Sequence, residues 1–153
     1  MNLENLLKKN SVETKLENFR SFARQMNPEK RATVENYAEK VVCKHLEDQG
    51  YKVEKYGKPF DFLATKENEK VKVEVKGTQN HAIKVEVTVN EVEVAKNIDR
   101  SYRTLLAVVD GIEVKQYDGT WEGSSGRLRT WWDMPFDESS LYPTRFQFTL
   151  PVE

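Results

Sequence analysis

The chain has 153 residues, with 24 Lys plus Arg against 25 Asp plus Glu and a formal net charge of −1 at neutral pH. This balance excludes a protein that is basic over its whole surface, and the 32% charged and 38% hydrophobic fractions exclude a low-complexity chain. A single domain of this length buries a core that needs no disulfide or metal for stability. The lone Cys43 can form no internal disulfide, which favours a reducing, cytoplasmic location.

Residues 1–26 carry apolar side chains at three-and-four spacing, which predicts one long or two short helices. The segment lacks the apolar run of a signal peptide, and no apolar span of ~20 residues occurs elsewhere, so we expect no membrane association. Residues 1–31 hold seven cations and four acids, so the near-zero total conceals a +3 segment against a −4 body. We predict a helical segment over residues 1–26 and one α/β domain over residues 27–153.

The first half of this domain changes from a helical to a strand period. Asn27 as N-cap and Pro28 at the first helical position predict a helix that ends at Gly50. From Tyr51 the period is two, which predicts a series of strands separated by turns. These strands cover residues 51–54, 60–65, 70–76 and 82–89, with residues 66–69 as a four-residue hairpin loop.

The second half begins with Asn90 and Glu93, which predict the capping box of a short helix ending near Asn97. The apolar run 104–109 is typical of a strand buried on both faces, and Asp110-Gly111 predicts a hairpin turn into a strand over 112–117. We expect a Gly- and Ser-rich loop over 118–126 and a last strand over 145–150. These elements predict a mixed β-sheet flanked by helices.

The hairpin loop fixes a register that places Asp61 opposite Glu74. Alternation then puts one set of side chains on an apolar face and another on a charged face. The apolar set is Phe60, Phe62, Ala64, Val71, Val73 and Val75, and the charged face carries Asp61, Lys72, Glu74 and Lys76. Two facing carboxylates repel unless a metal cation or a Lys lies between them, and Mg²⁺ prefers such oxygen ligands. Lys76 could stabilise charge on a phosphate beside this metal.

Asp61 in Pro59-Phe60-Asp61, followed thirteen residues later by Glu74-Val75-Lys76, resembles the PD-(D/E)XK nuclease motif. The preceding helix bears Glu35, which fits the assisting acid of that superfamily. The longer string from Glu74 to Thr78, with Glu91 and Ala95 on the next helix, is similar to the NO VEIN C-terminal domain family. The resemblance covers about residues 31–150.

The resemblance implies a restriction-endonuclease-like α/β fold and Mg²⁺-dependent hydrolysis of DNA phosphodiester bonds, with Mn²⁺ as a substitute ion. Asp61 and Glu74 would then bind the metal, Lys76 would position and activate water, and Glu35 would assist the metal site. The expected partner is DNA, in a restriction-modification or repair system, with the chain acting as a homodimer or in a larger assembly.

Substrate contacts are less sharply predicted than the metal site. Lys30, Arg31, Lys72 and Lys84 are candidate phosphate contacts, and Gln79 is either a substrate contact or a turn residue. Arg127, Arg129 and Trp131 would share one face of an extended segment, where they could track a backbone or simply cover the core.

Two functions of other classes remain open from the sequence. The fold could serve as a non-catalytic DNA-binding or sensing module, because exposed strand faces often carry Glu and Lys. Alternatively, residues 1–26 could form the partner helix of a protein-interaction domain. His45 and His81 have no neighbouring ligand at the spacing that zinc requires.

Overall fold

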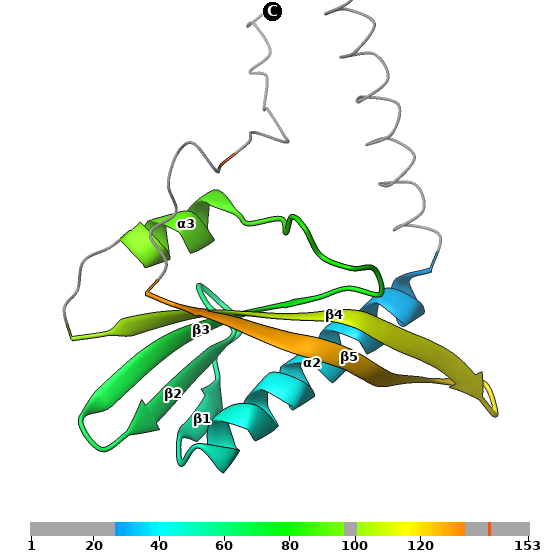
Figure 1. The fold of residues 1–153 in the computed structure, drawn as a ribbon, viewed down its shortest axis with the longest axis horizontal. Coiled ribbons are helices and arrows are strands. Elements are labelled where there is room, and N and C mark those ends of the chain that lie inside the picture. The colour runs from blue at the N-terminus through cyan, green and yellow to red at the C-terminus, as the bar shows by residue number, and fades with distance from the viewer. Residues whose placement is uncertain (1–26, 97–100, 134–140, 142–153) are drawn as a thin grey trace, which may run out of the picture.

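The computed structural model describes residues 27–96, 101–133 and 141. Its centre is a five-stranded mixed sheet of order β1-β2-β3-β4-β5, in which β3 and β4 are parallel and the other pairs antiparallel. Figure 1 shows α2 and α3 on opposite sides of this sheet. The elements are α2 (Pro28–Asp48), β1 (Lys52–Lys55), β2 (Phe62–Lys66), β3 (Glu69–Gly77), α3 (Val89–Lys96), β4 (Arg103–Tyr117) and β5 (Thr120–Trp132).

This arrangement confirms the predicted α/β, restriction-endonuclease-like fold, a mixed sheet flanked by helices. The helices predicted within residues 1–26 and the strand predicted over residues 145–150 lie outside the described residues.

Helix α2 begins as its sequence predicts. The Asn27 side-chain oxygen accepts a hydrogen bond from the Lys30 backbone N–H at 3.1 Å, and Pro28 occupies the first helical position. Its buried side chains recur at four-residue spacing and form one apolar stripe. They are Val34, Ala38, Val42 and Leu46.

The core lies between this stripe and one face of the sheet. The strands contribute the side chains Phe62, Ala64, Val71, Val73, Leu105, Ala107, Val109 and Ile112. Helix and sheet approach closely at Gly77, where an added Cβ would lie 2.7 Å from the Ala38 Cβ. A glycine is needed at this position because any side chain would push α2 away from β3.

The β2–β3 hairpin has the predicted register, with Thr65 paired to Lys70. Its loop is shorter than predicted, because Lys66 also pairs with Glu69 and only residues 67 and 68 make the turn. The regular pairing stops at Phe62 and Val73, because the backbone N–H of Asp61 donates to the Val73 carbonyl at 3.0 Å instead of pairing with Glu74. The Asp61 side chain nevertheless reaches the Val75 N–H, next to Glu74.

The prediction that Phe60 shares the apolar face with Phe62 is wrong. Phe60 lies in a bend before β2, where strand alternation no longer applies. Its ring stacks on Tyr56 with 5.0 Å between centroids, and it lines a pocket together with Lys72 and Glu74. Phe60 therefore belongs to the charged side of the sheet.

The prediction of a strand over residues 82–89 is also wrong. These residues belong to the crossover that joins the parallel strands β3 and β4 (Figure 1), and within the described part of the chain no strand pairs with them. Both positions beside β3 are taken, one by β2 and the other by β4. The alternating side chains consequently run over the sheet, and Ile83 is 86% exposed.

Asp110-Gly111 does not form the predicted turn. β4 continues through it with an unchanged register, and the Gly111 N–H donates to the Asn80 carbonyl at 3.1 Å. The chain reverses instead at Asp118-Gly119, where both residues have positive φ, +48° and +77°, as a two-residue hairpin turn requires. The loop predicted over residues 118–126 is therefore mostly strand β5.

Candidate active site

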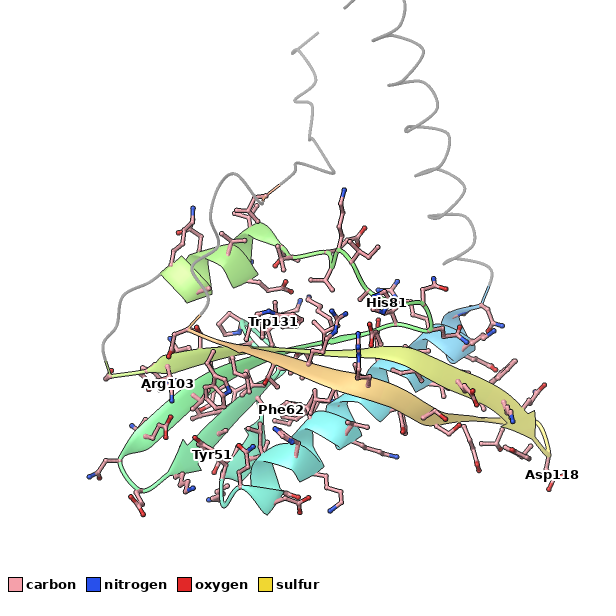
Figure 2. The ribbon with its side chains drawn as sticks, in the orientation of Figure 1. Tyr51, Phe62, His81, Arg103, Asp118 and Trp131 are labelled. Atoms are coloured by element: carbon pink, nitrogen blue, oxygen red, sulfur yellow. The ribbon has the colours of Figure 1, made fainter. Side chains whose placement is uncertain are left out.

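The face of the sheet beneath α3 carries a row of polar and charged side chains. Strand pairing aligns Glu74 with Leu106 and Leu106 with Trp131, so residues of three strands share this face. They are Lys72, Glu74 and Lys76 from β3, Leu106, Val108 and Asp110 from β4, and Arg127, Arg129 and Trp131 from β5. Figure 2 places Trp131 and His81 on this side. We call this surface the charged face.

At its centre one ammonium group lies between two carboxylates. Lys76 Nζ is 2.8 Å from Glu74 Oε1 and 2.9 Å from Glu91 Oε2. Asp61 lies next to them, with its Oδ2 accepting a hydrogen bond from the Val75 N–H at 2.8 Å. The side chains of Lys76, Glu74 and Glu91 are only 22%, 18% and 16% exposed. Asp61, Glu74, Lys76 and Glu91 together are the acid cluster.

Helix α3 brings Glu91 to this cluster. The Thr88 hydroxyl accepts from the Glu91 N–H at 3.2 Å, and Glu91 Oε2 accepts from the Thr88 N–H at 2.9 Å. These reciprocal bonds are a capping box, two residues earlier than the predicted box of Asn90 and Glu93. The spacing Thr88-x-x-Glu91 signals this box in the sequence, but only the fold shows that Glu91 also meets Lys76.

Burial and charge give the carboxylates of the cluster different acidities. Burial raises the pKa of Glu74 to about 7, and Asp61 and Glu91 reinforce the rise while Lys76 opposes it. Burial also raises the pKa of Asp61, against the effect of the Val75 N–H. For Glu91, burial is outweighed by the Thr88 N–H and Lys76, so its pKa is lowered. Glu74 is thus the least acidic of the three.

Lys76 remains a cation at neutral pH. Burial alone would lower its pKa, but Glu74 and Glu91 outweigh burial and raise it. A lysine with a raised pKa is a poor general base. Lys76 can therefore donate hydrogen bonds and stabilise negative charge, but it is not suited to accept a proton from water.

The structure does not bring Glu35 to the acid cluster. Glu35 lies on an exposed part of α2, and among the described residues its hydrogen bond goes to Arg31 at 2.9 Å. Glu39, one turn further along α2, is the helical carboxylate whose charge raises the pKa of Asp61. Glu39 also pairs with Lys55 at 2.7 Å. The helical period alone cannot choose between these two acids, since both lie outside the buried stripe.

The predicted substrate contacts are spread over the molecule. Lys72 lies on the charged face, with its Nζ 4.5 Å from the centroid of the Tyr102 ring. Lys30 and Arg31 lie at the start of α2, where Lys30 Nζ is 5.8 Å from the centroid of the Trp121 ring. Gln79 and Lys84 follow β3 in the crossover, and both are exposed. Of these residues, Lys72 lies nearest in the sheet to the acid cluster.

The donor set of the cluster suits a hard divalent cation with few protein ligands. Asp61 and Glu74 offer carboxylate oxygens from adjacent strands, and Mg²⁺ often binds one or two carboxylates with water and phosphate completing its shell. Burial raises the pKa of Glu74, and the neighbouring charges of Asp61 and Glu91 add to the rise, so a bound cation would favour its ionised form. In the described part of the chain, however, no three His, Cys, Asp or Glu side chains are grouped to hold a metal.

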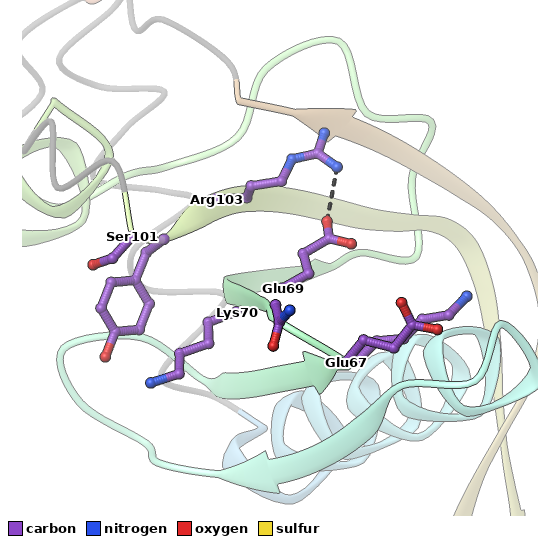
Figure 3. A pocket seen from close by; sticks show the side chains of 8 residues that line it. Glu67, Glu69, Lys70, Ser101 and Arg103 are labelled. Carbon is purple, nitrogen blue, oxygen red and sulfur yellow. Dashed lines mark hydrogen bonds and ion pairs between the residues drawn. The ribbon is translucent and has the colours of Figure 1, made fainter.

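The larger of two pockets in the described part of the chain does not lie at the acid cluster. A pocket of about 30 Å³ lies against the cluster and is lined by Glu74, Glu91 and Phe60 among others. A larger one of about 470 Å³ lies between the β2–β3 turn and the start of β4 (Figure 3). Its Arg103 is neutralised by Glu69 at 2.8 Å and by Asp133 at 2.8 Å. We place the candidate site at the acid cluster, because charged groups converge there on one buried ammonium.

Residues 34–120 match the family model described as Protein NO VEIN, C-terminal. The match covers more than half of the chain and spans the acid cluster, so the protein belongs to the NO VEIN C-terminal family, as the sequence motifs indicate. No curated protein matches the chain, and no solved structure does. Neither α2 nor α3 is long and apolar enough to cross a membrane.

Proposed function

We propose that the protein is a metal-dependent endonuclease of the PD-(D/E)XK type that hydrolyses DNA phosphodiester bonds. One observation carries the proposal: Asp61 Oδ2 accepts a hydrogen bond at 2.8 Å from the N–H of Val75, which lies between Glu74 and Lys76 in the chain, and Lys76 Nζ is 2.8 Å from Glu74 Oε1. An Asp on one strand and a Glu-x-Lys on its neighbour are the arrangement that the motif describes. Family membership is compatible with this activity and does not by itself assign it.

Each residue of the cluster has a role in this proposal. Asp61 and Glu74 would hold Mg²⁺ or Mn²⁺, which when bound supplies charge neutralisation at the phosphate and increases the acidity of water. Lys76, kept protonated by its two carboxylates, donates to a phosphate oxygen or orients the attacking water. Glu91 fixes the position of the Lys76 ammonium group.

Nicking of supercoiled plasmid in Mg²⁺ or Mn²⁺ tests the proposal. We expect nicking by the wild-type protein, its loss in EDTA, and a fall of about 100-fold or more in Lys76→Ala, the loss typical of a transition-state charge stabiliser. Lys44→Ala is the matched control, because Lys44 is exposed and its ion pair among the described residues is with Asp48 on its own helix. Nicking by Lys76→Ala at the wild-type rate, or none by the wild type with either metal, would contradict the proposal.

A second candidate function is a DNA-binding or sensing module that keeps the fold without the chemistry. Two observations favour it: Lys76 is already paired with both Glu74 and Glu91, and the described residues offer no three-carboxylate group for a metal. Such a module would bind DNA equally well in Mg²⁺ and in EDTA and would nick no plasmid. The proposed nuclease and this module therefore differ in two separate measurements.

A further inference from the structure

A second cluster of charges lies on the charged face, around the buried carboxylate of Asp110, which is 3% exposed. Its Oδ2 is 2.7 Å from Arg129 Nη2 and 3.1 Å from His81 Nδ1, and its Oδ1 is 3.7 Å from Arg127 Nε. Oδ2 also accepts a hydrogen bond from the Ala82 N–H at 3.0 Å. Three side chains that carry or can gain positive charge thus converge on one carboxylate.

These charges do not cancel. The Ala82 N–H, together with Arg129, Arg127 and His81, outweighs burial and lowers the pKa of Asp110, so the carboxylate is ionised at neutral pH. One negative charge therefore faces two guanidinium groups, and the cluster is positive even when His81 is neutral. A cluster of this sign on an otherwise acidic face is suited to an anionic ligand.

The members of the cluster divide into an anchor and an exposed pair. Arg129 is 29% exposed and also donates to the Ala82 carbonyl at 2.6 Å, so it fixes the start of the crossover to β5. The side chains of Arg127 and His81 are 60% and 66% exposed. Asp110 lies on one side of the Arg127 guanidinium and of the His81 imidazole, and the other side of each group is open to solvent. A guanidinium held in this way can bind a phosphate through two parallel hydrogen bonds.

The exposed pair lies within reach of a nucleic-acid strand that occupies the acid cluster. Lys76 aligns with Val108 and Val108 with Arg129, while Arg127 lies two residues further along β5, opposite Asp110. Two strand spacings are ~10 Å and two residues along a strand are ~7 Å, so the backbones of Lys76 and Arg127 are ~12 Å apart on one face. One strand of duplex DNA covers that length in about three to four nucleotides at ~3.4 Å each.

We propose that Arg127 and His81 form a phosphate-binding subsite for the nucleic-acid backbone, with Asp110 as the positioning residue that orients both. The proposal rests on the proposed function in one respect, that a nucleic acid is the ligand of the charged face. It assigns backbone binding to β5 and the crossover, rather than to Lys30 and Arg31 at the start of α2.

Fluorescence anisotropy with a short labelled DNA duplex in EDTA measures this binding without hydrolysis. We expect Arg127→Gln and His81→Gln each to weaken binding by about 3- to 10-fold, and Arg127→Gln to reduce the slope of log K against log salt by about 0.9, the value for one lost phosphate contact. Arg127→Lys should keep the wild-type salt slope because it keeps the charge, but it should recover only part of the affinity because lysine cannot make the two parallel hydrogen bonds. Arg31→Gln is the matched control, with a guanidinium 63% exposed and paired to one carboxylate, and it should bind as the wild type does.

The outcomes separate this subsite from hydrolysis. Three results would each overturn the subsite. The first is wild-type affinity and salt slope in the Arg127→Gln, His81→Gln double variant. The others are a loss of affinity in Arg31→Gln equal to that in Arg127→Gln, and no duplex binding by the wild type. Plasmid nicking that persists in those cases would leave the proposed endonuclease intact. Loss of binding in the double variant from a protein that nicks no plasmid would support the subsite and refute the endonuclease.

Discussion

The two faces of the sheet use alternate residues of the same strand for opposite purposes. On β3, Val71 and Val73 are fully buried beneath α2, while Glu74 and Lys76 point to the other side, beneath α3. The core face is held by apolar contacts that many side chains could make. The charged face depends on a few specific bonds, such as those of Lys76 to Glu74 and Glu91. A mutation on the first face should therefore act on stability, and one on the second face should act mainly on charge and chemistry.

The sharpest contrast is between two leucines. Leu46 is fully buried in the core, and Leu46→Ala should lower the free energy of unfolding by about 2–5 kcal/mol, because it leaves a cavity that the sheet cannot fill. Leu63→Ala makes the same change on the half-buried opposite face and should cost about half as much or less. Chemical denaturation measures both values. Equal losses would show that the charged face carries as much of the packing as the core.

Removal of the central cation should have the next largest effect on stability. Lys76→Met leaves Glu74 and Glu91 without their counter-ion and should cost about 1–3 kcal/mol at pH 8, less than for a fully buried pair because the group is partly exposed. The loss should shrink at pH 5, where Glu74 is protonated. Lys44→Met removes an exposed charge and should change stability by no more than about 0.5 kcal/mol. A loss that is the same at both pH values would contradict an electrostatic origin.

Stability should also depend on pH through Glu74. Its pKa in the folded protein is about 7, above the ordinary 4.5, so the folded state binds the proton more tightly than the unfolded state. The stabilisation from this proton is complete below about pH 4.5 and is lost as the pH rises to about 7 and above. Thermal unfolding of the metal-free protein from pH 5 to pH 8 should show this fall.

Glu74→Gln should flatten that pH dependence, because the amide does not titrate. Asp61, whose pKa is also raised, leaves a residual slope of the same sign. Glu93→Gln changes an exposed carboxylate of α3 and should leave the wild-type slope in place. If Glu74→Gln kept the full slope, another group would be its source.

The smallest expected effect is at the start of α3. Thr88→Ala removes the hydroxyl of the capping box and should cost about 1 kcal/mol of stability. Because the same box orients Glu91, nicking should fall several-fold as well. Thr33→Ala is the control, since the Thr33 hydroxyl bonds the Glu29 carbonyl within α2. Nicking by Thr88→Ala at the wild-type rate would show that Glu91 needs no cap to reach Lys76.

The sequence by itself determined the features whose causes lie within a few residues. Asn27 and Pro28 start α2, and four-residue spacing defines its buried stripe. Strand alternation and a short turn fix the β2–β3 register from Phe62 to Glu69. The bend before β2 then carries the Asp61 carboxylate to the Val75 N–H, next to Glu74. The motif Glu74-Val75-Lys76 was recognisable for the same reason, because all its members lie on one hairpin.

Only the tertiary structure decided which extended segments pair and which side chains meet across long separations. Residues 82–89 alternate as a strand does, yet β2 and β4 already occupy both sides of β3. The chain contains two Asp-Gly pairs with the same local turn signal, and the long β4–β5 ladder selects the one at residues 118 and 119. Glu91 joins Lys76, and His81 joins Asp110, through the docking of the crossover between β3 and β4 onto the sheet. Such contacts depend on which segments of the chain pair in the sheet or dock on it, and a local sequence pattern does not determine that choice.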